Sequence, residues 1–406
     1  MMEKNSRRQI LKFLSILAVF SAIVAIRFFD HEINPQGTTV FAFSYKYGFI
    51  SRGFMGTVLQ VLDTLLPWNL MCFDFIYLLS KLATLTCYFF LFAFFYVSLR
   101  RCRKEDFLRQ QMLIVFLCVF AIPMFVTTEN FGRLDTYLTI LMLIAMISFV
   151  EERWEWLCVP LSIVGTLIHH GFVFMYLNMS LVFLFYKLIC APEGRRKIYY
   201  GILFALTFLL PSCLFLYFEF FSHVNGAEIY DTVVAEAKAL SASGIDYSQS
   251  LVNHEILGEG VFMDEWYFHK LNYAETLEFA ILFLPYIILG IRFCRKLYKK
   301  ACGRGEKLCM LALVLGAWTV LPEMILKVDY GRYMFSLVFY YLAVMIILLA
   351  RRDTRASSVL SEIKEGVKAN MLAPALLIAY PMAMMPFLDV YISNISHMFV
   401  RLFGLQ

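Results

Sequence analysis

The sequence predicts an all-α protein, a polytopic bundle of transmembrane helices, and three observations support this. Of the 406 residues, 61% are hydrophobic and only 17% are charged, far from the average of soluble proteins. Apolar runs near twenty residues long recur along the chain, enough for helices to cross a bilayer core of roughly 30 Å. Basic residues gather in the short segments between these runs. We therefore expect one integral membrane domain over residues 1–406, with about eleven spans.

The basic segments predict how the helices are oriented. They lie at residues 4–12, 100–104, 195–197, 292–307 and 351–355. The positive-inside rule places them in the cytoplasm, and with them the N-terminus. Basic patches of this kind do not predict nucleic-acid binding. The ten cysteines lie in apolar runs or in cytoplasmic loops, so neither a disulfide framework nor a zinc site is expected.

The first half of the chain is expected to contain six spans, two of them short. We expect spans at 10–29, 70–99, 112–126 and 136–150. The first lacks a small-residue cleavage site and is expected to be retained, and residues 54–66 are expected to form a helix in the membrane interface. As one helix, residues 156–191 would extend about 54 Å, too long for a single crossing. Two short spans that meet at His169 and His170 each fit the bilayer, and they keep the later basic loops in the cytoplasm.

The second half carries one long polar segment. Spans are expected at 199–217, 275–291, 308–326, 334–350 and 371–388. Residues 218–274 form the expected extracytoplasmic loop, with nine acidic residues against Lys238 and Lys270. Its apolar residues recur at helical spacing, which predicts an amphipathic helix lying on the surface. These residues are Ile229, Val233, Val234 and Leu240.

This topology places the remaining polar clusters at the outer ends of the spans. The clusters are Asp30/His31/Glu32, Tyr47/Arg52, Glu129/Arg133/Asp135, His169/His170, Glu323 and Asp329/Arg332. Ionisable groups at membrane depth are costly and usually face a cavity or one another. We therefore expect one hydrophilic site that opens outward and is covered by the 218–274 loop. The alternative interpretation is that these groups cap helices and neutralise one another.

Two short motifs predict phosphate binding. They are Gly132-Arg133-Leu134-Asp135 and Asp329-Tyr330-Gly331-Arg332, and in each a glycine beside the arginine allows close approach. Arginines hold phosphate or pyrophosphate through forked hydrogen bonds. The expected substrate-binding residues are Tyr47, Arg52, Glu129, Arg133, His169, Asp329 and Arg332. The alternative is an Arg–Asp pair in each motif that has only a structural role.

Acid–base chemistry needs a second set of residues. A sugar hydroxyl that attacks an anomeric carbon needs a base within hydrogen-bond reach, and a phosphate leaving group needs positive charge. The expected catalytic residues are Asp30, Glu32, Asp135 and His170. This chemistry needs no cofactor. Adjacent histidines point in different directions, so His169 and His170 do not predict a metal site, although a divalent metal is compatible with the chemistry.

With these residues, the chain resembles bacterial multispanning enzymes of glycan assembly. Asp30 and Glu32 match the acidic motif that GT-C glycosyltransferases carry after their first helix. Arg52, Arg133 and Arg332 match the outer arginines of O-antigen-type polysaccharide polymerases. The chain has no clean DxD motif, and no soluble outer domain is expected after the last span as in larger GT-C enzymes; this departure favours a smaller sugar-transfer or polymerising enzyme. The resemblance implies a polyprenyl-phosphate-linked sugar donor, a glycan acceptor and a multi-pass location in the bacterial cytoplasmic membrane.

Two other functional classes remain open at this stage. A transporter or flippase would need charged residues at mid-depth and at the cytoplasmic ends, whereas the polar clusters here are one-sided. A membrane O-acyltransferase would use His169 or His170 as its base, and one histidine would then be indispensable while the arginines were not. A sensor or scaffold without chemistry is the remaining alternative.

Overall fold

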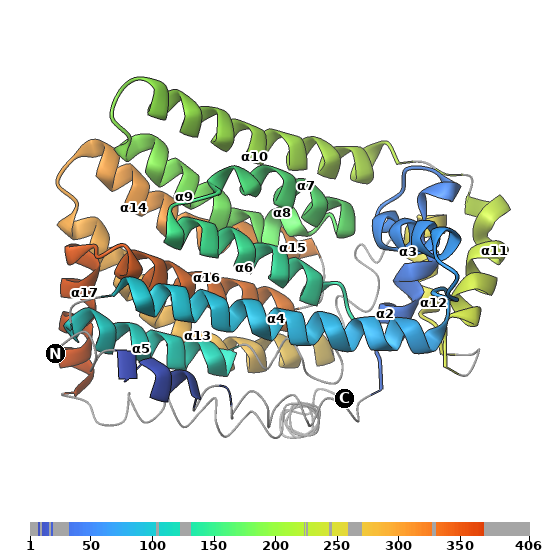
Figure 1. Ribbon diagram of the computed structural model, residues 1–406, viewed down its shortest axis with the longest axis horizontal. Helices are drawn as coiled ribbons and strands as arrows, with labels where there is room; N and C mark the ends of the chain where they lie inside the picture. Colours follow the sequence, from blue (N-terminus) through green and yellow to red (C-terminus); the bar gives the residue numbers. More distant parts are fainter. Residues whose placement is uncertain are drawn as a thin grey trace.

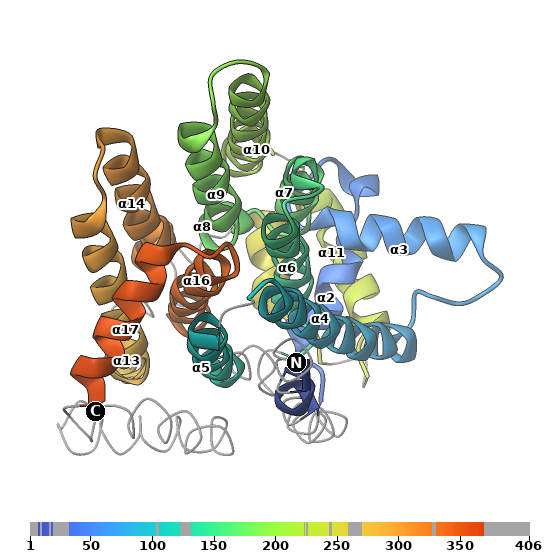
Figure 2. The same cartoon turned by 60° about the vertical axis from the view of Figure 1, so that its left-hand side comes forward.

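The computed structural model describes residues 7–8, 10–15, 18, 32–102, 105–121, 131–222, 224, 226–242, 246–258, 270–326 and 330–368. Every regular element in these residues is a helix, as the sequence predicts. The long helices lie side by side along one axis of the molecule (Figures 1 and 2). They are α4 (Phe73–Arg101), α5 (Glu105–Ala121), α6 (Asp135–Glu151), α9 (Leu177–Cys190), α10 (Arg195–Phe220), α13 (Lys270–Lys300), α14 (Arg304–Gly316) and α16 (Tyr330–Ala350).

Helix α16 is the centre of the bundle. It packs against α4, α5, α6 and α13, and every residue of its apolar window is buried inside the protein. Its apolar side chains are large and come from all faces of the helix, which is the pattern of a helix surrounded by other helices. This central helix therefore holds helices from both halves of the chain in one core.

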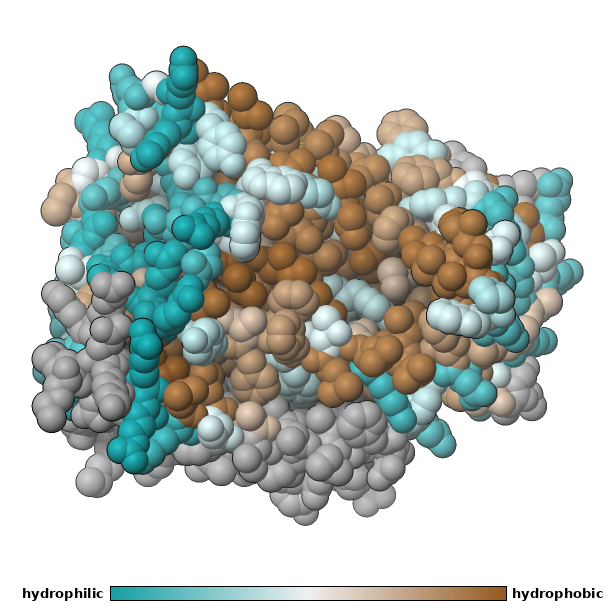
Figure 3. All heavy atoms as spheres, in the orientation of Figure 1, coloured by the Kyte–Doolittle hydropathy of each residue, from teal (hydrophilic) through white to brown (hydrophobic). Residues whose placement is uncertain are grey.

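Four helices in the described part of the chain are long and apolar enough to cross a membrane, which indicates a membrane protein. They are Phe73–Arg101, Arg195–Phe220, Arg304–Met324 and Arg332–Ala350. Figure 3 shows an apolar surface band along the middle of the bundle, between more hydrophilic ends. By length and apolar composition, the described residues thus contain fewer spans than the roughly eleven that the sequence predicts. The expected spans at 10–29 and 371–388 lie largely or wholly outside the described residues.

The expected break at the two histidines is confirmed. Helix α7 (Cys158–Ile168) ends before His169, whose backbone is extended, and a short helix α8 (Phe172–Met175) precedes α9. Gly165 allows the chain to fold back here, because a Cβ at this position would lie 2.6 Å from Cδ2 of Phe172. The break leaves the two histidines in the turn between α7 and α8, where both side chains are buried.

One end of the bundle carries a helical cap built from two distant segments. The first segment has α2 (Pro35–Thr39), η1 (Val40–Ala42), η2 (Tyr45–Tyr47) and α3 (Gly53–Leu65); the second has α11 (Gly226–Ala239), α12 (Gln249–Val252) and the π-helical turn η6 (Asn253–Leu257). These elements group at the right of Figure 1, and α3 extends away from the bundle in Figure 2. Helices α3 and α11 match the two helices expected at 54–66 and around Ile229–Leu240.

The cap is tightly packed. Gly56 brings α3 onto the preceding chain, because a Cβ there would lie 2.0 Å from the carbonyl oxygen of Phe43. Gly226 does the same for α11, where a Cβ would lie 2.1 Å from the carbonyl oxygen of Ile256. Phe41 and Phe43 are fully buried beneath these contacts. The cap is therefore a folded unit that can hold side chains in fixed positions over the helix ends.

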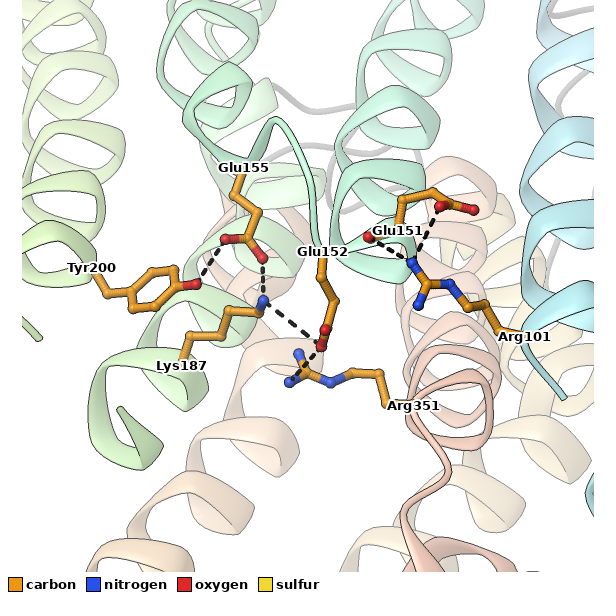
Figure 4. A network of polar contacts seen from close by, with 7 residues as sticks. All are labelled: Arg101, Glu151, Glu152, Glu155, Lys187, Tyr200 and Arg351. Atoms are coloured by element: carbon orange, nitrogen blue, oxygen red, sulfur yellow. Dashed lines mark hydrogen bonds and ion pairs between the residues drawn. The ribbon is translucent and has the colours of Figure 1, made fainter. Parts of the chain in front are cut away.

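The opposite end of the molecule is held together by ion pairs (Figure 4). The last residue of α6, the turn after it and the 3-10 helix η5 (Glu155–Leu157) carry three glutamates, which pair with cations on α4, on α9 and just after α16. Glu155 pairs with Lys187 and accepts a hydrogen bond of 3.0 Å from Tyr200, and Glu152 lies 3.3 Å from Arg351. Helix α17 (Thr354–Lys368) lies at the same end. The basic segments thus gather at the end away from the cap.

Candidate functional site at the capped end

The cap holds Ser51 and Arg52 over the break between α7 and α8. Arg52 has a left-handed backbone, with φ 58°, at the position that begins α3. A residue with a Cβ rarely adopts this conformation, which persists where the surrounding structure fixes it. The sharp turn directs both side chains towards His169 and His170, more than a hundred residues later in the chain.

His170 lies between a hydroxyl and a carboxylate. Its Nδ1 is 2.6 Å from Oγ of Ser51, and its Nε2 is 3.1 Å from Oε1 of Glu219, in the last turn of α10. Because a carboxylate only accepts, Nε2 carries the proton, and Nδ1 of the neutral ring accepts from the serine hydroxyl. Ser51 and His170 are buried, with exposed fractions of 9% and 4%. This order of hydroxyl, imidazole and carboxylate is the arrangement that activates hydroxyl groups.

His169 faces donors at both of its ring nitrogens. The Gly171 amide donates to Nδ1 at 2.9 Å, and Nη2 of Arg52 lies 3.1 Å from Nε2. A neutral imidazole has only one acceptor nitrogen, and arginine has donors only. The Gly171 amide and the Arg52 guanidinium therefore compete for the single acceptor nitrogen of a neutral His169.

A carboxylate from the predicted outer loop completes this cluster. Oε1 of Glu255, in η6, lies 3.2 Å from Nη1 of Arg52, and both side chains are largely buried. Nε2 of His254 lies 3.7 Å from the same carboxylate oxygen. The 218–274 segment thus contributes two residues to the cluster, Glu219 and Glu255, as well as covering part of it.

A second ion pair lies at the starts of α6 and α16. Nε and Nη2 of Arg332 lie 3.1 and 3.0 Å from Oδ1 of Asp135, and the Tyr176 hydroxyl lies 3.4 Å from the same oxygen. The two predicted motifs therefore pair across the bundle, with the arginine of the second on the aspartate of the first. The contact gives Asp135 a role as the counter-ion of Arg332, and its expected acid–base role remains untested.

Glu323 connects the histidines with the start of α16. It lies in α15 (Leu321–Leu326) and is 5% exposed. A Cβ built on Gly171 would be 3.5 Å from Oε1 of Glu323, and the Tyr333 hydroxyl is 3.5 Å from its Oε2. Gly171 therefore lets this carboxylate approach the histidine break. We refer below to Ser51, Arg52, His169, His170, Glu219 and Glu255 as the cap cluster.

The other expected site residues have different positions. Tyr47 contacts Lys46 and α11, and burial together with Glu236 raises its pKa. Glu32 is exposed, and Arg133 is partly buried in the turn before α6. Asp30, Glu129 and Asp329 lie outside the described residues. Sequence reasoning brought Arg52, His169 and His170 to one site, but it missed Ser51, Glu219 and Glu255.

The described residues contain no group of three or more His, Cys, Asp or Glu arranged to hold a metal ion. No family model, curated protein or solved structure matches the chain.

Proposed function

We propose that the chain is a multi-pass enzyme of the bacterial cytoplasmic membrane that transfers a sugar during glycan assembly. Its donor is a polyprenyl-phosphate-linked sugar, and the reaction takes place on the extracytoplasmic face. One observation carries the proposal: His170, held as a base by Glu219, packs against His169, whose Nε2 lies 3.1 Å from the largely buried guanidinium of Arg52. A base next to a cation is what transfer from a phosphate leaving group requires.

Each group has a stated role in this reaction. Arg52 holds the donor phosphate, whereas Arg332 is already paired with Asp135. His170 accepts the proton of the acceptor hydroxyl at Nδ1, directly or through the Ser51 hydroxyl. The acceptor oxygen bonds to the anomeric carbon, the bond from that carbon to the phosphate oxygen breaks, and polyprenyl phosphate leaves with the electron pair. No metal or cofactor is needed to balance this step.

The surface beside the cap suits a donor that arrives within the membrane. Helix α3 exposes a row of apolar side chains, including Val61 and Leu65, and Trp68 follows it with 64% of its surface exposed. Aromatic residues at such positions favour the level of the lipid headgroups. If the basic end lies in the cytoplasm, the cap cluster at the opposite end lies outside, where a donor phosphate would be.

Lipid analysis of a deletion strain tests this function without knowledge of the sugar. Deletion of the gene in its host is expected to remove a surface glycan and to raise the amount of a polyprenyl-phosphate-linked sugar. Mass spectrometry of extracted lipids measures the precursor, and the wild-type gene should restore both. Unchanged precursor lipids, together with an unchanged glycan profile, would contradict sugar transfer.

Acyl transfer is the second candidate, because Ser51 lies 2.6 Å from His170. Here Oγ of Ser51 attacks the carbonyl carbon of an acyl ester or thioester, its proton passes to His170, and the alcohol or thiol leaves with that proton. The acyl group then passes to a glycan hydroxyl. A fluorophosphonate probe distinguishes the two candidates, because only the acyl mechanism predicts labelling that Ser51→Ala abolishes.

A further inference from the structure

The Arg52–Glu255 pair has charges in place but lacks good geometry. Nη1 of Arg52 lies 3.2 Å from Oε1 of Glu255, yet this buried oxygen accepts no hydrogen bond in the described part of the protein. The Nε–H of Arg52 is also buried, without an acceptor among the described residues. A buried ion pair offsets the desolvation of its charges only when its hydrogen bonds are well made. This pair therefore leaves donor capacity for another anion.

Arg52 and Glu255 both have an unusual backbone conformation. Arg52 has the left-handed conformation described above, and Glu255 lies in the π-helical turn Asn253–Leu257. π-Helical turns are rare and occur frequently at functional sites. The Glu255 side chain is only 4% exposed, so its charge is held against the arginine and away from solvent. These features indicate a contact kept for a purpose other than stability.

We propose that Glu255 is an exchangeable counter-ion, which the phosphate of an anionic lipid ligand replaces on Arg52. This inference rests on the proposed function, because it assigns the donor phosphate to that arginine. A phosphate presents several acceptor oxygens, so it can accept from the guanidinium fork and from Nε, which the carboxylate does not satisfy. The phosphate then repels the Glu255 carboxylate, and the α12–η6 segment at 246–258 moves away from the arginine.

The exchange makes the site selective for charge. A neutral lipid cannot displace the Glu255 carboxylate, because the charge of the buried Arg52 guanidinium would then have no counter-charge. An anionic lipid binds only after it has overcome the competition from Glu255. Removal of this competing charge should therefore strengthen phosphate binding, whereas removal of an ordinary structural partner should weaken it.

Binding of farnesyl phosphate to the purified full-length protein in nanodiscs tests the exchange. Glu255→Gln keeps the size of the side chain and removes its charge, so we expect a Kd lower by on the order of tenfold, equivalent to about 1.4 kcal/mol. Arg52→Gln should abolish the binding. Glu228→Gln, an exposed acidic position on α11, should leave it unchanged. Unchanged or weaker binding by Glu255→Gln would overturn the proposal.

Two further probes identify the part of the ligand that is recognised. Farnesol should show no difference between wild type and Glu255→Gln, since it has no charge. Inorganic phosphate should show the same tightening as farnesyl phosphate, with lower affinity, if the headgroup alone causes the exchange. Tightening of farnesol binding would mean that Glu255 affects the lipid chain and would contradict charge exchange.

Hydrogen exchange on the wild-type protein gives a test that needs no variant. Addition of farnesyl phosphate should increase amide exchange in residues 246–258, because Glu255 is released. Decreased or unchanged exchange would contradict the release. Neither experiment requires turnover. If Glu255→Gln tightens phosphate binding but the deletion strain keeps its glycan, the exchange is retained and sugar transfer is refuted. If the deletion strain loses its glycan but Glu255→Gln does not tighten binding, only the exchange is refuted.

Discussion

At the scale of single residues, His170 is the group on which the proposed chemistry depends. Glu219 fixes which ring nitrogen carries the proton, and Ser51 occupies the nitrogen that accepts. His169, its neighbour in sequence, has the opposite environment, with donors at both nitrogens. The two adjacent histidines therefore have different surroundings: Nδ1 of His170 is suited to accept a proton, and His169 faces the Arg52 guanidinium.

Substitutions around His170 should affect sugar transfer in a defined order. His170→Gln should lower the rate by about 10²–10⁴-fold, the usual contribution of a general base. Glu219→Gln should lower it less, because the imidazole remains but its orientation is lost. Initial rates in membranes with matched protein levels measure both, with Glu228→Gln as the control. Equal rates for wild type and His170→Gln would exclude His170 as the base.

Three of the six cap-cluster residues could be predicted from the sequence, because each is a polar residue next to an apolar run. Arg52, His169 and His170 are polar groups beside apolar runs, so topology alone brings them to one side. Ser51 gives no such signal, because a serine beside an arginine is common and its partner is 119 positions away. Asp135 and Arg332 were expected to be near acidic or basic neighbours in their own motifs, but only packing shows that they pair with each other.

At the scale of elements, the turn between α6 and α7 is locked to the ends of α9, α10 and α16. Glu155 is 5% exposed and Lys187 is 8% exposed, and Tyr200 fills the second oxygen of the glutamate. The break at the histidines was predictable because one helix over 156–191 would be too long. The contacts of Glu155 were not, since its two partners, Lys187 and Tyr200, come from different helices.

Breaking this pair should destabilise the protein strongly. Lys187→Met leaves the Glu155 charge buried without its main partner, and we expect a loss of about 3–5 kcal/mol in unfolding free energy. The double variant Lys187→Met/Glu155→Gln should recover part of it. Denaturant unfolding in detergent measures both, with the exposed Lys197→Met as control. If Lys187→Met is as stable as this control, the Lys187–Glu155 pair does not stabilise the protein as expected.

Helix α17 should show a pH-dependent contribution from Glu362. Hydrogen bonds from Lys296 and Lys300 lower the pKa of this carboxyl from 4.5 to about 2. A lowered pKa means that the stabilisation is complete above pH 4.5 and is lost as the pH falls towards 2. The melting-temperature difference between wild type and Glu362→Gln should therefore be constant from pH 5 to 8 and shrink below 4.5. A difference that grows in acid would contradict this assignment.

At the scale of the whole molecule, two polar ends lie on either side of an apolar band (Figure 3). Sequence reasoning predicted the helical class and the gathering of basic segments at one end. It could not predict that the cap combines residues 35–65 with residues 226–257, because their contacts join segments almost 200 positions apart.

The expected orientation, with the basic end in the cytoplasm, can be measured with thiol labelling. Cys302 is exposed at the basic end, so a membrane-impermeant maleimide should label it only after the cells are permeabilised. Glu228→Cys, on the cap, should be labelled in intact cells. Labelling of Cys302 in intact cells would reverse the orientation and place the cap cluster in the cytoplasm.

The most direct test of the central claim is complementation of the deletion strain by cap-cluster variants. His170→Gln and Arg52→Lys should fail to restore the glycan and should leave lipid-linked sugar at the level of the deletion strain. Glu228→Gln should restore both at the same membrane abundance. Full restoration by His170→Gln and Arg52→Lys would show that the cap cluster is not the site of sugar transfer.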